Sequence, residues 1–308
     1  MRPRVFIPFL LSLTFLFAGC ATGVPEEEVA QVYYNLGKAY ADLDRNNDAI
    51  KAYSRALSYD ASLFQAGYNL ARMYIELGKF DEAEVILRDL LTEDPENTVL
   101  LETEAWSYHL QGNPSRALEI YEGILKKVPN HKNALFNAGV LAMEKGDSGR
   151  AYELFTDLYG YTPEDEEVLL RLGFLEREQG NPEKAVELLE KCVKKNPENR
   201  EALLALGEIH VTLARYGDAV TYYDKALELE ASSELLFEKA FILLTALEDY
   251  DEGMATLAKA VEEGFSDTER VIQLAEYPEL YNAQEIIPFL VEKGLYEIPD
   301  TTGEPEVE

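Results

Sequence analysis

Small residues recur at a fixed spacing of thirty-four positions along most of this chain. One column consists of Gly37, Ala71, Ala105, Gly139, Gly173 and Gly207. A second column consists of Ala49, Ala83, Ala117, Ala151, Ala185 and Ala219, and a third of Pro95, Pro129, Pro163 and Pro197, with Ala61 and Ala231 at its ends. Six consecutive units in one register predict a repeat architecture, in which each unit packs mainly against its neighbours.

The residue types in these columns predict the same local structure in every unit. Glycine or alanine in the first two columns lets two helices approach closely. Four glycines are expected to end first helices in the left-handed conformation: Gly78, Gly112, Gly146 and Gly180. Pro114 and Pro182 are expected to open second helices, where a missing N–H costs nothing. The prolines of the third column are expected to end second helices.

The pattern resembles the tetratricopeptide repeat, a helix–turn–helix unit of thirty-four residues. This resemblance implies an all-α, right-handed superhelical solenoid of antiparallel helix pairs, with about seven repeats followed by C-terminal capping helices. The solenoid is expected to span residues 29–265, in units 30–63, 64–97, 98–131, 132–165, 166–199, 200–233 and a degenerate unit 234–265. Capping helices are expected over 266–298, and a disordered acidic tail over 299–308.

The first twenty residues predict an export signal. Arg2 and Arg4 precede an apolar run from Val5 to Ala18, which is shorter than the ~20 residues that cross a bilayer. The stretch that ends at Cys20, FAGC, resembles the lipobox of bacterial lipoproteins, although Phe17 stands where that family usually has leucine. An ordinary signal peptide followed by a chance cysteine is the alternative.

The lipobox resemblance implies removal of residues 1–19, lipid on Cys20 and a short linker over residues 20–28. Two or three acyl chains would hold the protein firmly to a membrane. In many Gram-negative lipoproteins an aspartate after the cysteine retains the protein at the inner membrane. Ala21 occupies that position here and favours the periplasmic face of the outer membrane.

Composition and motifs exclude several other classes of function. The chain has 28 Lys+Arg against 58 Asp+Glu, a net charge of −30, which argues against nucleic acid or an anionic bilayer as the main ligand. Three histidines lie far apart, and no glycine-rich phosphate loop occurs. Cys192 shares its column with apolar residues and is predicted to be an inert buried thiol. We therefore predict no catalytic residue, no metal site, no cofactor and no enzymatic activity.

The family resemblance also implies where a partner would bind. In tetratricopeptide repeats the first helices line a concave face that binds peptides or partner segments. The matching residues are Tyr34, Asn35, Lys38, Tyr68, Asn69, Arg72, Trp106, His109, Phe136, Asn137, Arg171, Phe174 and Arg177. The alternative is that they are ordinary solvent-facing helix positions.

Three features favour a binding groove at these positions. Asn35, Asn69 and Asn137 share one column, and a carboxamide can pair with both the N–H and the C=O of an extended peptide. Four cations concentrate there in an acidic chain and are expected to attract an acidic segment. The face also carries five aromatic side chains, and aromatic residues and arginine are favoured at interface hot spots.

These observations predict a non-enzymatic scaffold, anchored by lipid in the bacterial envelope, that grips an extended or helical segment of an envelope protein. The alternative is a transport accessory lipoprotein that binds a small ligand or delivers it to a solute-binding protein or permease. Self-assembly through the ends of the solenoid is a third possibility.

Overall fold

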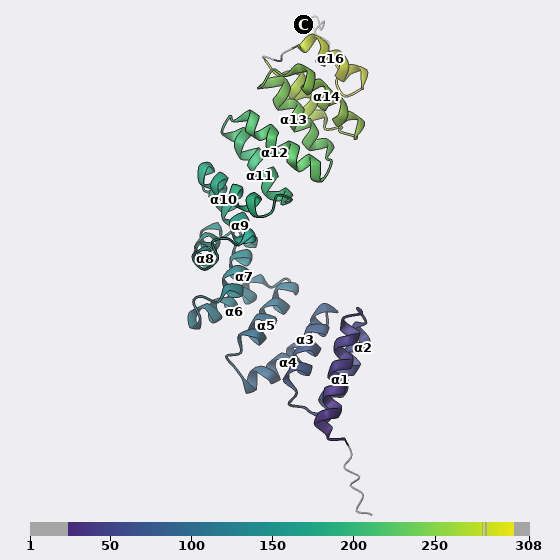
Figure 1. The fold of residues 1–308 in the computed structure, drawn as a ribbon, viewed down its shortest axis with the longest axis vertical. Helices are drawn as coiled ribbons and strands as arrows, with labels where there is room; N and C mark the ends of the chain where they lie inside the picture. Colours follow the sequence, from purple (N-terminus) through teal and green to yellow (C-terminus); the bar gives the residue numbers. More distant parts are fainter. Residues whose placement is uncertain (1–23, 279, 281, 299–308) are drawn as a thin grey trace, which may run out of the picture. The chain divides into compact units, whose positions relative to one another are not determined.

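The computed structural model describes residues 24–278, 280 and 282–298, which form sixteen α-helices and no strand (Figure 1). The predicted signal peptide, Cys20 and the predicted acidic tail lie outside the described residues. The chain divides into two compact units, residues 1–120 and 121–308. Of the helices in the described ranges, none is both long enough and apolar enough to cross a bilayer.

The first unit is a stack of helix pairs. It contains α1 (Glu26–Ala41), α2 (Asn46–Tyr59), α3 (Phe64–Glu76), α4 (Phe80–Glu93), α5 (Thr98–Leu110) and the first half of α6 (Pro114–Lys127). In this unit α1 packs against α2, α2 against α3, α3 against α4 and α4 against α5. Helix α1 begins earlier than expected, because residues 26–28 of the predicted linker form its first turn. Three glutamates there complement the positive end of the helix dipole.

The second unit continues the same arrangement. It holds the rest of α6, then α7 (Lys132–Glu144), α8 (Ser148–Tyr161), α9 (Glu166–Glu178), α10 (Pro182–Lys195), α11 (Arg200–Thr212), α12 (Tyr216–Leu229), α13 (Ser233–Thr245) and α14 (Tyr250–Glu262). Each first helix packs against the second helix that follows it, from α7 with α8 to α13 with α14. The degenerate seventh unit therefore still forms a helix pair.

The turns between paired helices all adopt the left-handed conformation at one position of the repeat. The four predicted glycines have φ between 69° and 79°. The same position in the other three units is occupied by Asp44, Ala214 and Glu248, with φ of 56°, 53° and 52°. These residues pay a steric cost that glycine avoids. The geometry of the turn is therefore imposed by the packing of the helix pair and not by glycine alone.

The small-residue columns lie at the closest contacts between helices. All six alanines of the second column have exposed fractions of 0%. In the first column, a Cβ added to Gly207 would lie 2.1 Å from Cε1 of Tyr223, and one added to Gly139 would lie 2.7 Å from Cε2 of Phe155. The aromatic ring of a second helix thus occupies the space that a larger first-helix residue would need.

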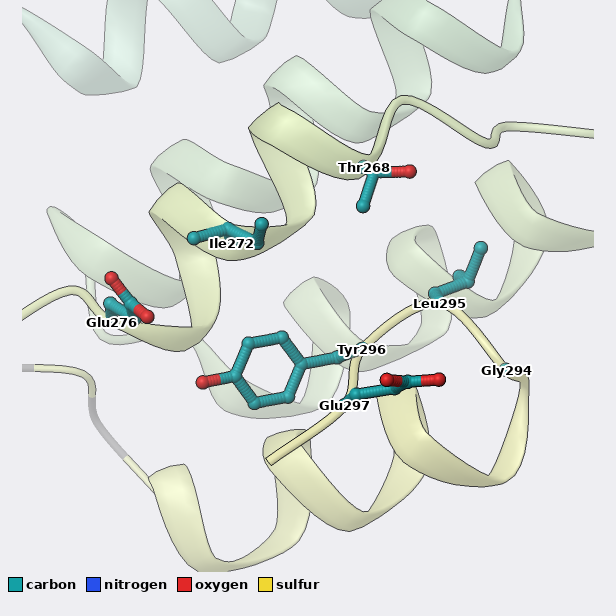
Figure 2. Close-up of a pocket in the computed structure, with 7 residues that line it drawn as sticks. All are labelled: Thr268, Ile272, Glu276, Gly294, Leu295, Tyr296 and Glu297. Carbon is teal, nitrogen blue, oxygen red and sulfur yellow. The ribbon is translucent and has the colours of Figure 1, made fainter. Parts of the chain in front are cut away.

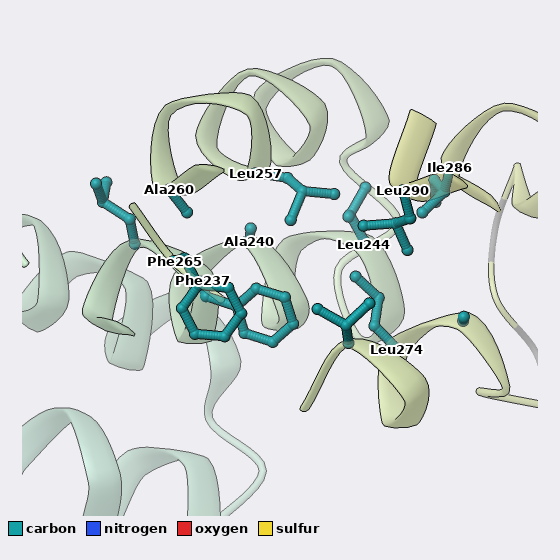
Figure 3. Packing of buried hydrophobic residues seen from close by; sticks show 12 residues of the cluster. Phe237, Ala240, Leu244, Leu257, Ala260, Phe265, Leu274, Ile286 and Leu290 are labelled. Carbon is teal, nitrogen blue, oxygen red and sulfur yellow. The ribbon is translucent and has the colours of Figure 1, made fainter. Parts of the chain in front are cut away.

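Two further helices, α15 (Thr268–Ala275) and α16 (Ala283–Glu292), pack onto the last repeat of the second unit. Figure 3 shows their leucines and isoleucine meeting residues of α13 and α14. Within this cluster Phe237 and Phe265 stack with ring centroids 4.1 Å apart. Leu274, Ile286 and Leu290 have exposed fractions of 0%. The last repeat therefore has its apolar end face covered.

Candidate functional site

The predicted binding residues of the first unit lie on three successive first helices. Helix α1 carries Tyr34, Asn35 and Lys38, α3 carries Tyr68, Asn69 and Arg72, and α5 carries Trp106 and His109. None of these side chains is buried. The thirty-four-residue register therefore places them at accessible positions of equivalent helices, as a binding surface requires.

The aromatic side chains of this surface are held in place by their neighbours. Tyr34 lies against Tyr53, with ring centroids 6.0 Å apart. Burial raises the pKa of Tyr53 to about 12, so the supporting phenol stays neutral. Tyr68 stacks on Phe64 at 6.2 Å, and Trp106 packs against the core between α3 and α5. A partner would meet rings that are already ordered, which lowers the entropic cost of binding.

The two asparagines of the first unit that were predicted to bind the partner, Asn35 and Asn69, each use only part of their hydrogen-bonding capacity within their own helices. Asn35 Oδ1 accepts a hydrogen bond from Gln31 Nε2 at 3.2 Å, which leaves its Nδ2 donors available. Asn69 Nδ2 donates to the backbone oxygen of Gln65 at 2.8 Å, which leaves its Oδ1 acceptor available. Together they can offer one donor and one acceptor to an extended backbone.

The predicted cations are mostly paired with carboxylates already. Arg72 lies 3.5 Å from Glu76, and Arg177 Nη1 lies 2.7 Å from Glu208 Oε2. Arg171 pairs with Glu167 of its own helix. The positive field of the surface is therefore weaker than the sequence suggests, because a neighbouring carboxylate offsets each arginine. This reduces the expected attraction for an acidic segment.

The second unit presents a smaller set of the predicted residues. Phe136 and Asn137 lie on α7, and Arg171, Phe174 and Arg177 lie on α9. Phe136 packs edge-on against Phe155 at 5.8 Å. The guanidinium of Arg177 lies 5.5 Å from the ring centroid of Phe174, so one arginine contacts both a ring and Glu208.

Lys239 was missed by the sequence reasoning, although it stands in the same column as Asn137 and Arg171. Its exposed fraction is only 8%, and its Nζ lies 2.5 Å from Asp224 Oδ1 and 2.7 Å from Glu252 Oε1. Extending the column by two more periods would have found it. Its burial would not have been evident, because the two carboxylates come from different helices.

Other chemistry has little support in the described part of the chain. No group of three or more His, Cys, Asp or Glu there could hold a metal ion. Cys192 is buried, and burial raises the pKa of its thiol to about 11, which makes it a poor nucleophile.

A pocket of about 360 Å³ lies between α15 and residues 294–297, and its lining includes Ile272, Leu295 and Tyr296 (Figure 2). None of the predicted binding residues lines it.

Comparison with known proteins gives matches over most of the repeat region. Family models described as tetratricopeptide repeat match residues 40–105, 103–166 and 170–235. An uncharacterized lipoprotein of Treponema pallidum (strain Nichols) is 31% identical over 141 residues, which cover 46% of this chain and 70% of that protein.

Among the solved structures that share the fold are two crystal structures. One is a tetratricopeptide repeat protein from Parabacteroides merdae, with 18% identity, a TM-score of 0.56 and coverage of 79% of this chain and 96% of that one. The other is PilW, a widely conserved type IV pilus biogenesis factor, with 19% identity, a TM-score of 0.56 and coverage of 68% and 97%. At these identities the likeness concerns the fold.

Proposed function

The chain belongs to the tetratricopeptide repeat family, and from this premise we propose that it is a scaffold that binds a segment of another envelope protein while lipid on Cys20 holds it to a membrane. Repeats of this family mediate protein–protein interactions, and their fold is typically non-catalytic. The partner segment is extended or helical and lies across successive first helices.

The observation that carries the proposal is the series of ordered, accessible aromatic rings on successive first helices of the first unit. Tyr34, Tyr68 and Trp106 are each supported from beneath by core side chains, and none is buried. Such rings provide large contact areas at low entropic cost, and aromatic residues often carry most of the energy of an interface. Because the arginines are paired, recognition would depend on these rings and on backbone contacts with Asn35 and Asn69.

The binding surface can be tested with the double variant Asn35→Ala, Asn69→Ala. Each substitution removes the hydrogen-bonding partner of a desolvated backbone group in the bound segment, which typically costs ~1–3 kcal/mol. We expect affinity for the partner to fall about tenfold to a hundredfold or more. A photocrosslinking residue in place of Tyr68 in intact cells, followed by mass spectrometry, identifies the partner. Calorimetry then measures the affinity of the partner for the wild-type protein and the variants.

The matched control is Asn47→Ala, Asn130→Ala, because both of these asparagines are exposed and lie outside the predicted groove. Circular dichroism checks that both double variants keep the wild-type fold. Unchanged affinity in the groove variant, with its helices intact, would refute this binding surface.

The lipid anchor has support from two sources. The stretch that ends at Cys20 resembles a lipobox, and the T. pallidum relative is named a lipoprotein. With Ala21 after the cysteine, the proposed location is the periplasmic face of the outer membrane. The segment from Ala21 to Pro25 would allow a reach of roughly 17 Å between the lipid and α1, so the repeats would work close to the membrane.

Replacement of the proposed acylation site tests the anchor. We expect Cys20→Ser to abolish incorporation of labelled palmitate and the membrane attachment that acylation provides, because no acyl chain would remain. Flotation of cell membranes on a density gradient measures the distribution, with Cys192→Ser as the control. Palmitate labelling that persists in Cys20→Ser would show that the lipobox interpretation is wrong.

A further inference from the structure

Helix α1 has an exposed apolar stripe on the side that faces away from α2. Val32 and Leu36 have exposed fractions of 64% and 39%, and Ala39 on the same helix is exposed as well. Together with the half-buried Val29, these residues follow spacings of three and four and share one side of the helix, and Leu43, 67% exposed, follows in the turn after α1. Within the described ranges, no other helix covers this stripe.

The repeat register shows what this side of a first helix normally does. The positions equivalent to Val32 are all apolar and have exposed fractions of 0% to 4%: Ala66, Leu100, Ala134, Val168, Ala202 and Leu236. The positions equivalent to Ala39 have exposed fractions of 0% to 7%: Met73, Ser107, Leu141, Leu175, Ile209 and Leu243. The first repeat has thus kept apolar side chains at positions that every later repeat buries.

The element that buries these positions is the second helix of the preceding repeat. In the second unit, Ala202, Leu206 and Ile209 of α11 form one core cluster with Val186 and Leu189 of α10. In the first unit, Leu70 and Met73 of α3 cluster with Tyr53 of α2. The stripe on α1 is therefore shaped to receive one helix, as α11 receives α10.

The two terminal repeats differ in whether another helix covers their apolar end face. Helices α15 and α16 cover the end face of the seventh repeat. Terminal repeats usually present a polar outer face to water. An apolar face retained on the first repeat is the opposite of that arrangement and marks a surface for docking.

Charge determines the kind of helix that fits. Glu28, Asn35 and Asp42, spaced by seven, form an exposed row beside the stripe. A second copy of α1 would bring like charges together, in a chain whose net charge is −30. A bilayer is also disfavoured, because interfacial helices depend on Lys and Arg beside their apolar face.

We propose that the stripe docks one helix of another protein, apolar on one face and flanked by Lys or Arg. Val32, Leu36 and Ala39 are not among the proposed groove residues, although Asn35 borders both surfaces.

The test uses two synthetic peptides of 21 residues as probes. Both have leucine and alanine at seam positions of a seven-residue repeat, one with lysine and one with glutamate at the flanking positions. Binding to the full chain carrying Cys20→Ser is measured by fluorescence anisotropy. We expect the lysine peptide to bind and to lose about tenfold or more in affinity with Val32→Gln, Leu36→Gln. The control Val85→Gln, Val99→Gln alters two valines of similar exposure in the same unit and should bind normally.

Several results would overturn the proposal. Equal binding of the lysine peptide to the stripe variant and to the control would show attraction by overall charge only. Equal binding of the lysine and glutamate peptides would show that Glu28 and Asp42 do not select a helix flanked by Lys or Arg. A wild-type dimer that the stripe variant lacks, seen by sedimentation, would assign the face to a second copy. Flotation of the Cys20→Ser chain with lipid vesicles that depends on Val32 and Leu36 would assign it to the bilayer.

Discussion

Removal of the two carboxylates that bind Lys239 is expected to destabilise the second unit by roughly 3 kcal/mol in the double variant Asp224→Ala, Glu252→Ala. The lysine lies on α13, and its partners lie on α12 and α14. Burial lowers the pKa of Lys239, but hydrogen bonds and charge from both carboxylates outweigh burial and raise it. The ammonium is therefore charged at neutral pH and would lose its compensation in the variant. The carboxylates themselves are about half exposed, which places the cost at the lower end of the usual range.

A third substitution separates this explanation from simple loss of packing. Adding Lys239→Met to the double variant removes the uncompensated charge and should recover most of the lost stability, since a buried ion pair can often be replaced by an apolar side chain. Urea unfolding measures all variants. As a control, Glu187→Ala breaks the exposed pair with Lys191 and should leave the midpoint nearly unchanged. A double variant as stable as wild type would contradict the proposed role of the carboxylates.

The substitution Gly207→Ala is expected to destabilise the protein by about 1–3 kcal/mol through overpacking. Its Cβ would lie 2.1 Å from Cε1 and 2.4 Å from Cδ1 of Tyr223. Tyr223 is 5% exposed and its ring belongs to the core between α11, α12 and α13, so it has little room to move. This penalty should exceed the gain of up to ~1 kcal/mol that alanine brings within a helix. Thermal unfolding followed by circular dichroism checks the result.

The repeat itself supplies the controls for this prediction. Ala71 stands in the column of Gly207, and Leu87 stands in the column of Tyr223, so an Ala–Leu pair already exists in the first unit. Tyr223→Leu should therefore relieve part of the cost of Gly207→Ala, and the two changes should be non-additive. Gly123→Ala, where the added Cβ meets nothing within 4 Å, should be neutral or stabilising. Additive effects in the double variant would show that the ring is not the obstacle.

The fold could be predicted from the sequence because its determinants are local and repeated. A thirty-four-residue period in small residues and prolines is sufficient for a stack of helix pairs, since each repeat contacts mainly the next one. The same register placed the predicted partner-binding residues on first helices, and none of them is buried. Their role as a binding surface stays a prediction, because exposure alone does not separate a groove from ordinary solvent-facing positions.

By itself, then, the sequence determined the period, the helix pairs, their turns and the columns of close contact, because these depend on residue type at fixed spacing. Only the tertiary structure decided which charges meet. Arg177 reaches Glu208 on α11, and Lys239 is drawn inward between carboxylates of α12 and α14. It also decided that Ala214 adopts a positive φ and that Val32 stays uncovered. These outcomes depend on which helices adjoin a residue in space, and a periodic sequence does not show where a stack begins or how long side chains pair across it.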